Sequence, residues 1–547
     1  MSVRYFHVVF VAVLFTVLGV SRVTAQVPPD LILFNGKVFT SDLAVPTAEA
    51  IALSGERVSA VGSNAAIRKL AGSNTRMIDL KGRAVVPGFN DAHAHFSPKF
   101  QGIDLNFTSM EPTWAEVAEA LKSAAGSAPK GKWIFGTIGR DAMNAPLANR
   151  KELDAIAPDH PVMLSTYFGH GAVLNSRAMS VLKIREDQPD PLGGHFERES
   201  KTKALNGRMF EYAQWNLDRI LVEQGSDADL IAEMKKRAAA AAAFGITSMQ
   251  VMPSISTERY LRLASVADLP IRIRAIAFST TDTRRRDMSD IDALVKAKPA
   301  NKMVRASGIK WILDGTPIER GAALRKDYND RKGWRGTLNF DASEIEKIVR
   351  ESLQLDQPLL LHCVGDRACE AVFDAMEKVG EGKVNWKEKR VRIEHGEVVI
   401  DDLIKRAKQL GVVIVQNPSH FTDGEMGRQR WGGGKAPIRT YIEQGIPFAL
   451  GSDGPLNPFL NIMFAVTHPD NPAEAISREQ AVIAYTSGSA YAEFAEAQKG
   501  KLEAGMLADL AVLSQDIFAI KTEQLPATTS VLTIVGGRIV HDAGVLK

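Results

Sequence analysis

The chain has 547 residues, of which 45% are hydrophobic and 24% are charged. These proportions are those of a soluble globular protein, and they exclude a disordered chain, a collagen-like chain and a polytopic membrane protein. A formal net charge of +3 gives no reason to expect nucleic acid or anionic lipid as a partner, and it leaves a homo-oligomer open.

Residues 1–25 have the pattern of a secretory signal peptide. Arg4 supplies the positive start, and an uncharged, mostly apolar stretch runs from Tyr5 to Ser21. Val23-Thr24-Ala25 then places small residues for cleavage before Gln26. An uncleaved anchor is the alternative, but the stretch is short for a membrane span of about 20 residues. We therefore expect an exported protein, periplasmic or secreted, with no stable membrane insertion after cleavage.

The two ends of the mature chain carry similar β-rich patterns. Residues 30–40 alternate in polarity around an Asn35-Gly36 turn, and short strands are expected again after residue 500. Two short β-rich ends bury too little surface alone, so they commonly pair. We predict a discontinuous β-sandwich domain from residues 26–83 and 500–547.

The middle of the chain, residues 84–499, alternates short apolar runs with amphipathic helical patterns such as 342–355 and 367–379. The eight runs are 84–89, 245–250, 271–278, 308–313, 358–361, 391–394, 411–415 and 447–451. Eight buried strands with intervening helices predict an α/β fold, a (β/α)8 TIM-like barrel. An open doubly wound sheet is the alternative, but no Gly-rich dinucleotide loop supports it.

The long spacing between the first and second runs does not fit a plain barrel. Strand-like runs at 133–139 and 162–167 and further helical patterns fill it. We interpret residues 105–230 as a lobe inserted over the barrel mouth.

Cys363 and Cys369 are the only cysteines. Six residues apart, on a strand and a helix, they have no evident reason to meet. We expect two small buried apolar residues, with a disulfide as the alternative.

The strongest chemical signal is His93-Ala-His95 after an apolar run. Residues i and i+2 of a strand point the same way, so both imidazoles would face one point. His362, His395 and Asp453 also follow predicted strands, whose carboxyl ends converge at a barrel mouth. Together they form a set suited to zinc or a similar divalent ion. A structural histidine is the alternative for each single imidazole.

The sequence resembles the amidohydrolase superfamily, and within it amidohydrolase family 3, the YtcJ-like branch that includes N-substituted formamide deformylases. The resemblance covers nearly all of the mature chain. It rests on segments 33–40, 87–95, 308–315, 451–454 and 499–513, and on the later histidines.

The resemblance implies a role for each matching residue. His93 and His95 would bind one metal ion, and His362 and His395 a second. Asp453 would contact the metal and act as proton acceptor. Lys310 would bridge two ions as a carbamate; a plain lysine paired with Asp314 is the alternative.

Weaker matches to the family lie elsewhere. His170 is predicted to contact the substrate, with a surface or structural role as the alternative, and Glu211 to be structural. Gln250 is a departure, because relatives often carry His there, and it puts the family's substrate preferences in doubt. Asn417, His420 and Trp431 follow the seventh strand and are expected to line the pocket.

We therefore predict an enzyme, a metal-dependent hydrolase that cleaves a non-peptide carbon–nitrogen bond in a small-molecule substrate. A divalent ion, zinc above all and one or two per chain, would activate water, with Asp453 as general base. A metal-dependent esterase or lactonase and a non-catalytic binding barrel are the alternatives.

Overall fold

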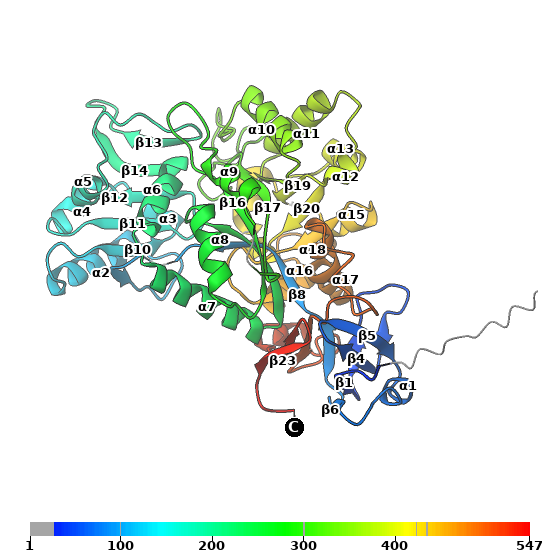
Figure 1. The fold of residues 1–547 in the computed structure, drawn as a ribbon. Coiled ribbons are helices and arrows are strands. Elements are labelled where there is room, and N and C mark those ends of the chain that lie inside the picture. Colours follow the sequence, from blue (N-terminus) through cyan, green and yellow to red (C-terminus); the bar gives the residue numbers. More distant parts are fainter. Residues whose placement is uncertain (1–26, 99, 299–300, 423, 434–435, 547) are drawn as a thin grey trace, which may run out of the picture.

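The computed structural model describes residues 27–98, 100–298, 301–422, 424–433 and 436–546. The predicted signal peptide lies outside them. At the centre is an eight-stranded sheet in which every neighbouring pair is parallel (Figure 1). Its strands follow in chain order: β8 (Phe89–Phe96), β15 (Ile246–Pro253), β16 (Arg272–Phe278), β17 (Val304–Ile312), β18 (Leu359–Cys363), β19 (Arg392–His395), β20 (Val413–Gln416) and β21 (Phe448–Leu450). The predicted TIM-like barrel is confirmed.

The two edge strands of this sheet, β8 and β21, come together just after β21. The amide of Asp453 donates to the carbonyl oxygen of His93 at 2.9 Å. Gly451 packs directly on His93, since a Cβ at this position would lie 2.5 Å from the His93 nitrogen. The absence of a side chain therefore lets the two edges approach and closes the ring beside the predicted ligands.

Helices cover the outside of the barrel. Helix α10 illustrates why: Asp341 caps its first turn, and Ile345, Ile348, Val349 and Ser352 form one buried stripe. The helices from residue 227 onward are α7 (Asp227–Ala243), α8 (Thr257–Val266), α9 (Ser289–Lys296), α10 (Ala342–Gln354), α11 (Asp366–Gly380), α12 (Trp386–Lys389), α13 (Asp402–Leu410), α14 (Gly424–Trp431), α15 (Ile438–Glu443), α16 (Pro458–Thr467), α17 (Arg478–Ile483) and α18 (Ser489–Ala492). None of the helices in the described ranges is long and apolar enough to cross a membrane.

The prediction that residues 84–89 form the first barrel strand is wrong, because the barrel strand begins only at Phe89. The run divides into β7 (Ala84–Pro87), which joins a different sheet, and β8, which enters the barrel. Pro87 has no N–H to donate, and Gly88 lies against Thr247, whose Oγ1 would be 2.1 Å from an added Cβ. The Pro-Gly pair thus lets the chain pass from one sheet to the other.

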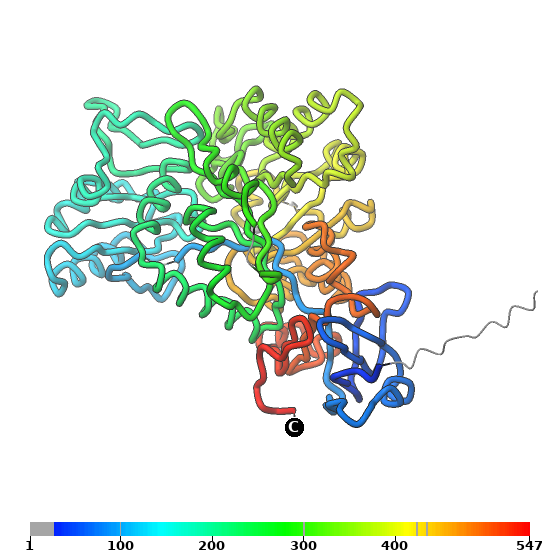
Figure 2. Tube along the Cα trace, viewed as in Figure 1, coloured from blue at the N-terminus to red at the C-terminus, as the bar shows by residue number. Residues whose placement is uncertain are grey.

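Two further sheets form a β-sandwich from both ends of the chain (Figure 2). One contains β5 (Arg57–Gly62), β4 (Ala50–Ser54), β1 (Leu31–Phe34) and β6 (Arg76–Asp79). The other contains β24 (Arg538–Asp542), β23 (Ser530–Val535), β22 (Leu510–Leu513), β7, β2 (Lys37–Phe39) and β3 (Thr47–Ala48). In the second sheet β7 pairs with β2 on one side and with β22 on the other, so the two ends share one hydrophobic core.

The segment between β8 and β15 forms a lobe beside the barrel, coloured cyan to green in Figure 1. Its six-stranded sheet has the order β13 (Gly194–Arg198), β14 (Leu205–Glu211), β12 (Gly171–Leu174), β11 (Val162–Thr166), β10 (Ile134–Ile138), β9 (Ile103–Leu105). The lobe helices are α2 (Trp114–Ser127), α3 (Arg140–Asn144), α4 (Arg150–Ile156), α5 (Ser176–Val181) and α6 (Tyr212–Val222), and α1 (Asn64–Arg68) belongs to the sandwich.

Candidate metal centre

Strand β8 brings both of its histidines to the barrel mouth. The Nδ1 atom of His93 lies 2.5 Å from Glu394, a fully buried carboxylate on β19. This contact places the proton on Nδ1 and leaves the lone pair of Nε2 free to bind a cation. His95 is more open, with 30% of its side chain exposed, and its ring centroid lies 5.4 Å from that of His93.

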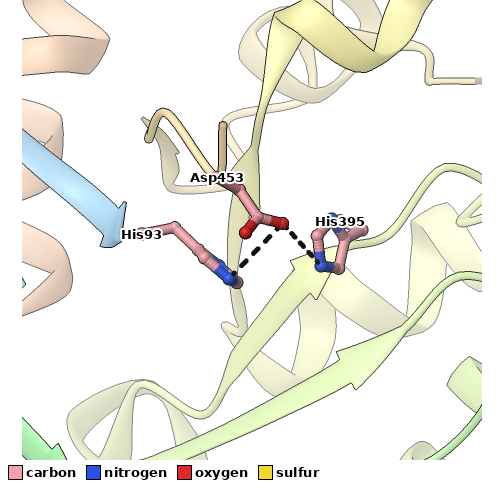
Figure 3. A group of neighbouring side chains, drawn as sticks. All are labelled: His93, His395 and Asp453. Atoms are coloured by element: carbon pink, nitrogen blue, oxygen red, sulfur yellow. Dashed lines mark ion pairs between the residues drawn. The ribbon is translucent and has the colours of Figure 1, made fainter. Parts of the chain in front are cut away.

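His395 and Asp453 complete the group with His93 (Figure 3). Oδ2 of Asp453 lies 3.7 Å from Nε2 of His93 and 3.7 Å from Nε2 of His395, and Oδ1 lies 3.5 Å from Nε2 of His95. His395 and Asp453 both have left-handed backbones, with φ of 71° and 37°. Non-glycine residues in this region cluster at functional sites. At His395 the left-handed backbone occurs where two consecutive residues, Glu394 and His395, both contact the His93–Asp453 group.

His362 and Lys310 face the same space from β18 and β17. The ring of His362 lies 4.4 Å from that of His395. Nε2 of His362, Nε2 of His93 and Nζ of Lys310 are buried without a hydrogen-bond partner in the described structure. The alternative pairing of Lys310 with Asp314 is wrong, because Asp314 accepts the backbone N–H groups of Ala323, Val364 and Gly365 instead.

Burial controls the charge of these groups. It lowers the pKa of His95 to about 3 and, helped by neighbouring imidazoles, holds the pKa values of His362 and His395 well below normal. Burial also lowers the pKa of Lys310 to about 8. For Asp453, burial raises the pKa of the carboxyl. The nearby imidazoles of His93, His95 and His420 have the larger opposite effect and keep this pKa well below its usual range. Neutral imidazoles around an ionised carboxylate are the form in which these side chains bind metal ions.

The inserted lobe contributes His170 and Glu211 to the mouth. His170 precedes β12, and its ring lies 5.2 Å from that of His362. Its Nδ1 is 2.9 Å from Glu211, which also accepts from Asn339. Burial disfavours the charged imidazole, yet Glu211 outweighs it and raises the pKa of His170 to about 9. The lobe thus places a polar pair directly above the candidate ligands.

Of the remaining predicted residues, some contact the candidate metal ligands and others lie away from them. His420 stacks on His395, and Asn417 lies 3.2 Å from Nδ1 of His395, so both support the centre. Gln250 is fully buried and contacts arginines, one layer farther from the mouth. Trp431 packs in a separate apolar cluster. Cys363 and Cys369 are free and buried, as expected.

Sequence reasoning missed two carboxylates that hold the centre in place. Glu394 orients His93, and Asp91 accepts the amides of His93 and Ser452 at 3.2 and 2.8 Å. A signal for Asp91 exists in the Asn90-Asp91-Ala92-His93 segment, since its i+2 spacing places it on the side of the histidines. Glu394 sits one residue before His395, where strand alternation alone predicts the opposite face.

Comparison with known proteins identifies this arrangement. The model of the amidohydrolase family, Amidohydro_3, matches residues 76–541, well over half of the chain. The chain belongs to the amidohydrolase family. The match spans every strand of the barrel and, in the sandwich, the strands from β6 onward, and the resemblance noted from the sequence is confirmed.

Relatives of this amidohydrolase match nearly end to end. Protein LONG AFTER FAR-RED 3 of Arabidopsis thaliana is 27% identical over 94% of this chain and 92% of its own length. The N-substituted formamide deformylase of Arthrobacter pascens is 26% identical over 93% and 97%. The crystal structure of an uncharacterized metal-dependent hydrolase from Pyrococcus furiosus is 25% identical, with a TM-score of 0.67, over 89% and 99%. The fold of this hydrolase is therefore shared over 89% of the chain.

Proposed function

We propose that this amidohydrolase cleaves the carbon–nitrogen bond of a non-peptide amide or N-substituted formamide and depends on a divalent metal ion, zinc above all. The observation that carries the proposal is the group of buried, unpartnered nitrogen atoms facing Asp453. Nitrogen and carboxylate donors of this kind suit zinc. The matches to a formamide deformylase and to a metal-dependent hydrolase support it.

The donor set would hold one ion or two. The contacts of Asp453 with His93, His95 and His395 favour these four residues for a first ion, although the resemblance pairs His395 with His362. His362, next to His395, would then join Lys310 in holding the other. A buried lysine ammonium would repel a cation, so we propose that Lys310 acts as a carbamate: its neutral amine adds to carbon dioxide, forms an N–C bond and loses one proton to solvent, which leaves a negative charge. A divalent ion bound there supplies an activated water and polarises the scissile carbonyl.

Side chains of the protein would then carry out the proton transfers. Asp453 stays ionised, and its carboxylate accepts the proton of the attacking water and returns it to the leaving nitrogen. His170 stands beside His362 and is held by Glu211, and we place it at the substrate, where its imidazole would donate to an oxygen or nitrogen of the bound amide.

The test is reconstitution of the mature protein. Chelator-treated protein should be inactive, and zinc should restore hydrolysis of a panel of N-substituted formamides and acyl amides. Cleavage of esters and lactones with refusal of every amide would favour an esterase. Retained binding of panel compounds without any turnover would favour a non-catalytic barrel.

Asp453→Asn tests the proton carrier in the same assay. Loss of a general base typically costs about 100- to 10,000-fold in rate. We expect kcat to fall within that range while the zinc content of the purified protein changes little, because three histidines remain. Unchanged turnover would contradict the role of Asp453.

A further inference from the structure

Gln250 lies at the floor of the metal centre, inside the barrel. It is fully buried on β15, and its amide oxygen accepts from two guanidinium groups, Arg274 of β16 at 2.9 Å and Arg392 of β19. Its amide nitrogen donates to the carbonyl oxygen of Ser489 at 3.1 Å. Guanidinium groups only donate, so the orientation of the amide is determined.

The residue type follows from these contacts. A neutral imidazole has one acceptor nitrogen, whereas an amide oxygen has two lone pairs and can accept from both arginines. In the described structure the other hydrogen bond of Arg274 goes to the backbone carbonyl of Ser307. Gln250 therefore accepts from two guanidinium groups that lie side by side inside the barrel, which a neutral imidazole at this position could not do.

From Arg392 the contacts continue to the metal centre. Its Nε and Nη2 atoms form a bidentate pair with Glu394, at 2.7 and 3.0 Å, and Nη2 also donates to the carbonyl of Ala92. Glu394 in turn holds Nδ1 of His93 at 2.5 Å. The side chains from Gln250 to His93 are all buried, so no solvent competes for these bonds.

We propose that Gln250 is a positioning residue for the metal centre: through Arg392 and Glu394 it holds the imidazole of His93 with Nε2 aimed at the ion. The inference rests on the proposed function, since it assumes that His93 binds the metal. It assigns to Gln250 a structural link to the ligand rather than a contact with the substrate. Partners that orient ligating histidines typically contribute 10- to 100-fold to metal affinity.

The experiment compares zinc affinity, measured by competition with a chelator, in the full mature chain and its variants. Gln250→Met removes the acceptor at similar volume and should weaken zinc about tenfold. Gln250→Glu keeps an oxygen between the arginines and should stay within about threefold of the wild type. Both variants lose the bond to Ser489, so their difference reports the oxygen between the arginines together with its added charge. Met249→Leu, the neighbouring outward-facing residue, is the control and should leave affinity unchanged.

A second comparison asks whether Gln250 acts through Glu394. In a Glu394→Gln background, Gln250→Met should cost little further affinity, because residues of one network are not additive. A Co²⁺-loaded sample should show an altered visible spectrum for Gln250→Met and a wild-type spectrum for Gln250→Glu.

Two results would overturn the inference: wild-type zinc affinity in Gln250→Met, or a folded Gln250→Glu whose zinc affinity falls about tenfold or more below that of the wild type. The second keeps the test decisive if Gln250→Met fails to fold. A wild-type chain that binds no divalent ion at all would instead refute the proposed function. Zinc binding by the wild type is therefore measured before any variant is compared with it.

Discussion

Buried nitrogen atoms without hydrogen-bond partners destabilise a folded chain. Three nitrogen atoms that have no partner among the described residues, on His93, Lys310 and His362, surround His395 and Asp453. An unsatisfied buried donor costs roughly 1–3 kcal/mol. A sequence selected for stability alone would replace them with apolar side chains. Their presence together at the strand ends indicates that the stability is given up for ion binding, as is common at functional sites.

Lys310→Met tests this at a single residue. In chelator-treated protein the substitution removes an unpartnered amine and should raise the free energy of unfolding by about 1–3 kcal/mol. The same variant should lose much of its zinc. Urea unfolding of the metal-free proteins and metal analysis give the two values.

Lys499→Met is the matched control, since Lys499 is mostly buried but pairs with Glu493 at 2.7 Å. Its removal leaves a buried carboxylate unpaired and should destabilise the protein. A metal-free Lys310→Met that is less stable than the wild type would show that the amine has a partner in solution.

The position of a site residue could be predicted from the sequence where its side chain follows the alternation of its strand. His93 and His95 are two residues apart on β8, and the structure brings them to one group with His395 and Asp453 as predicted from strand ends. Glu394 was missed because its role depends on the φ of 71° at His395, and no residue type signals that turn. Gln250 was noticed only as a departure, since its two arginine partners come from strands far apart in the chain.

At the scale of elements, periodicity located the eight barrel strands except the first, where the sequence contains the Pro87-Gly88 break but does not say which sheet each half joins. Helices were predicted from their apolar stripes to within about a residue, as at α11, which begins at Asp366, one residue before the prediction. Helix α6 of the lobe differs, because it carries a partly buried carboxylate, Asp218, toward the protein interior.

Asp218 makes the stability of α6 depend on pH. Burial raises the pKa of Asp218 to about 7, against about 3.9 in an unfolded chain. The folded state therefore binds the proton more tightly, and the stabilisation present below about pH 4 is lost as pH rises to 7. Asp218→Asn, which cannot ionise, should gain stability relative to the wild type at pH 8 and much less at pH 4.5, by thermal unfolding. The exposed Asp292→Asn on α9 is the control, and an equal effect of Asp218→Asn at both pH values would contradict the assignment.

At the scale of the whole molecule, the barrel and the sandwich share a buried connection. Arg272 begins β16 of the barrel, and Asp509 precedes β22 of the sandwich; their side chains form a bidentate pair at 2.7 and 3.1 Å. Asp509 also accepts the amide of Gly536. The sequence predicted both domains, but the residues that join them lie 237 positions apart and carry no local signal.

Asp509→Asn should therefore weaken the whole molecule and not only the sandwich. The amide can still accept from Gly536, but the guanidinium of Arg272, largely buried, loses its counter-charge, and such losses cost about 3–5 kcal/mol. Asp159→Asn removes a pair of the same kind with Lys130 at 2.8 Å, but both side chains are mostly exposed, so a change below about 1 kcal/mol is expected. Urea unfolding measured by circular dichroism compares the two variants. If both midpoints shift equally, the buried pair contributes no more to stability than a surface pair.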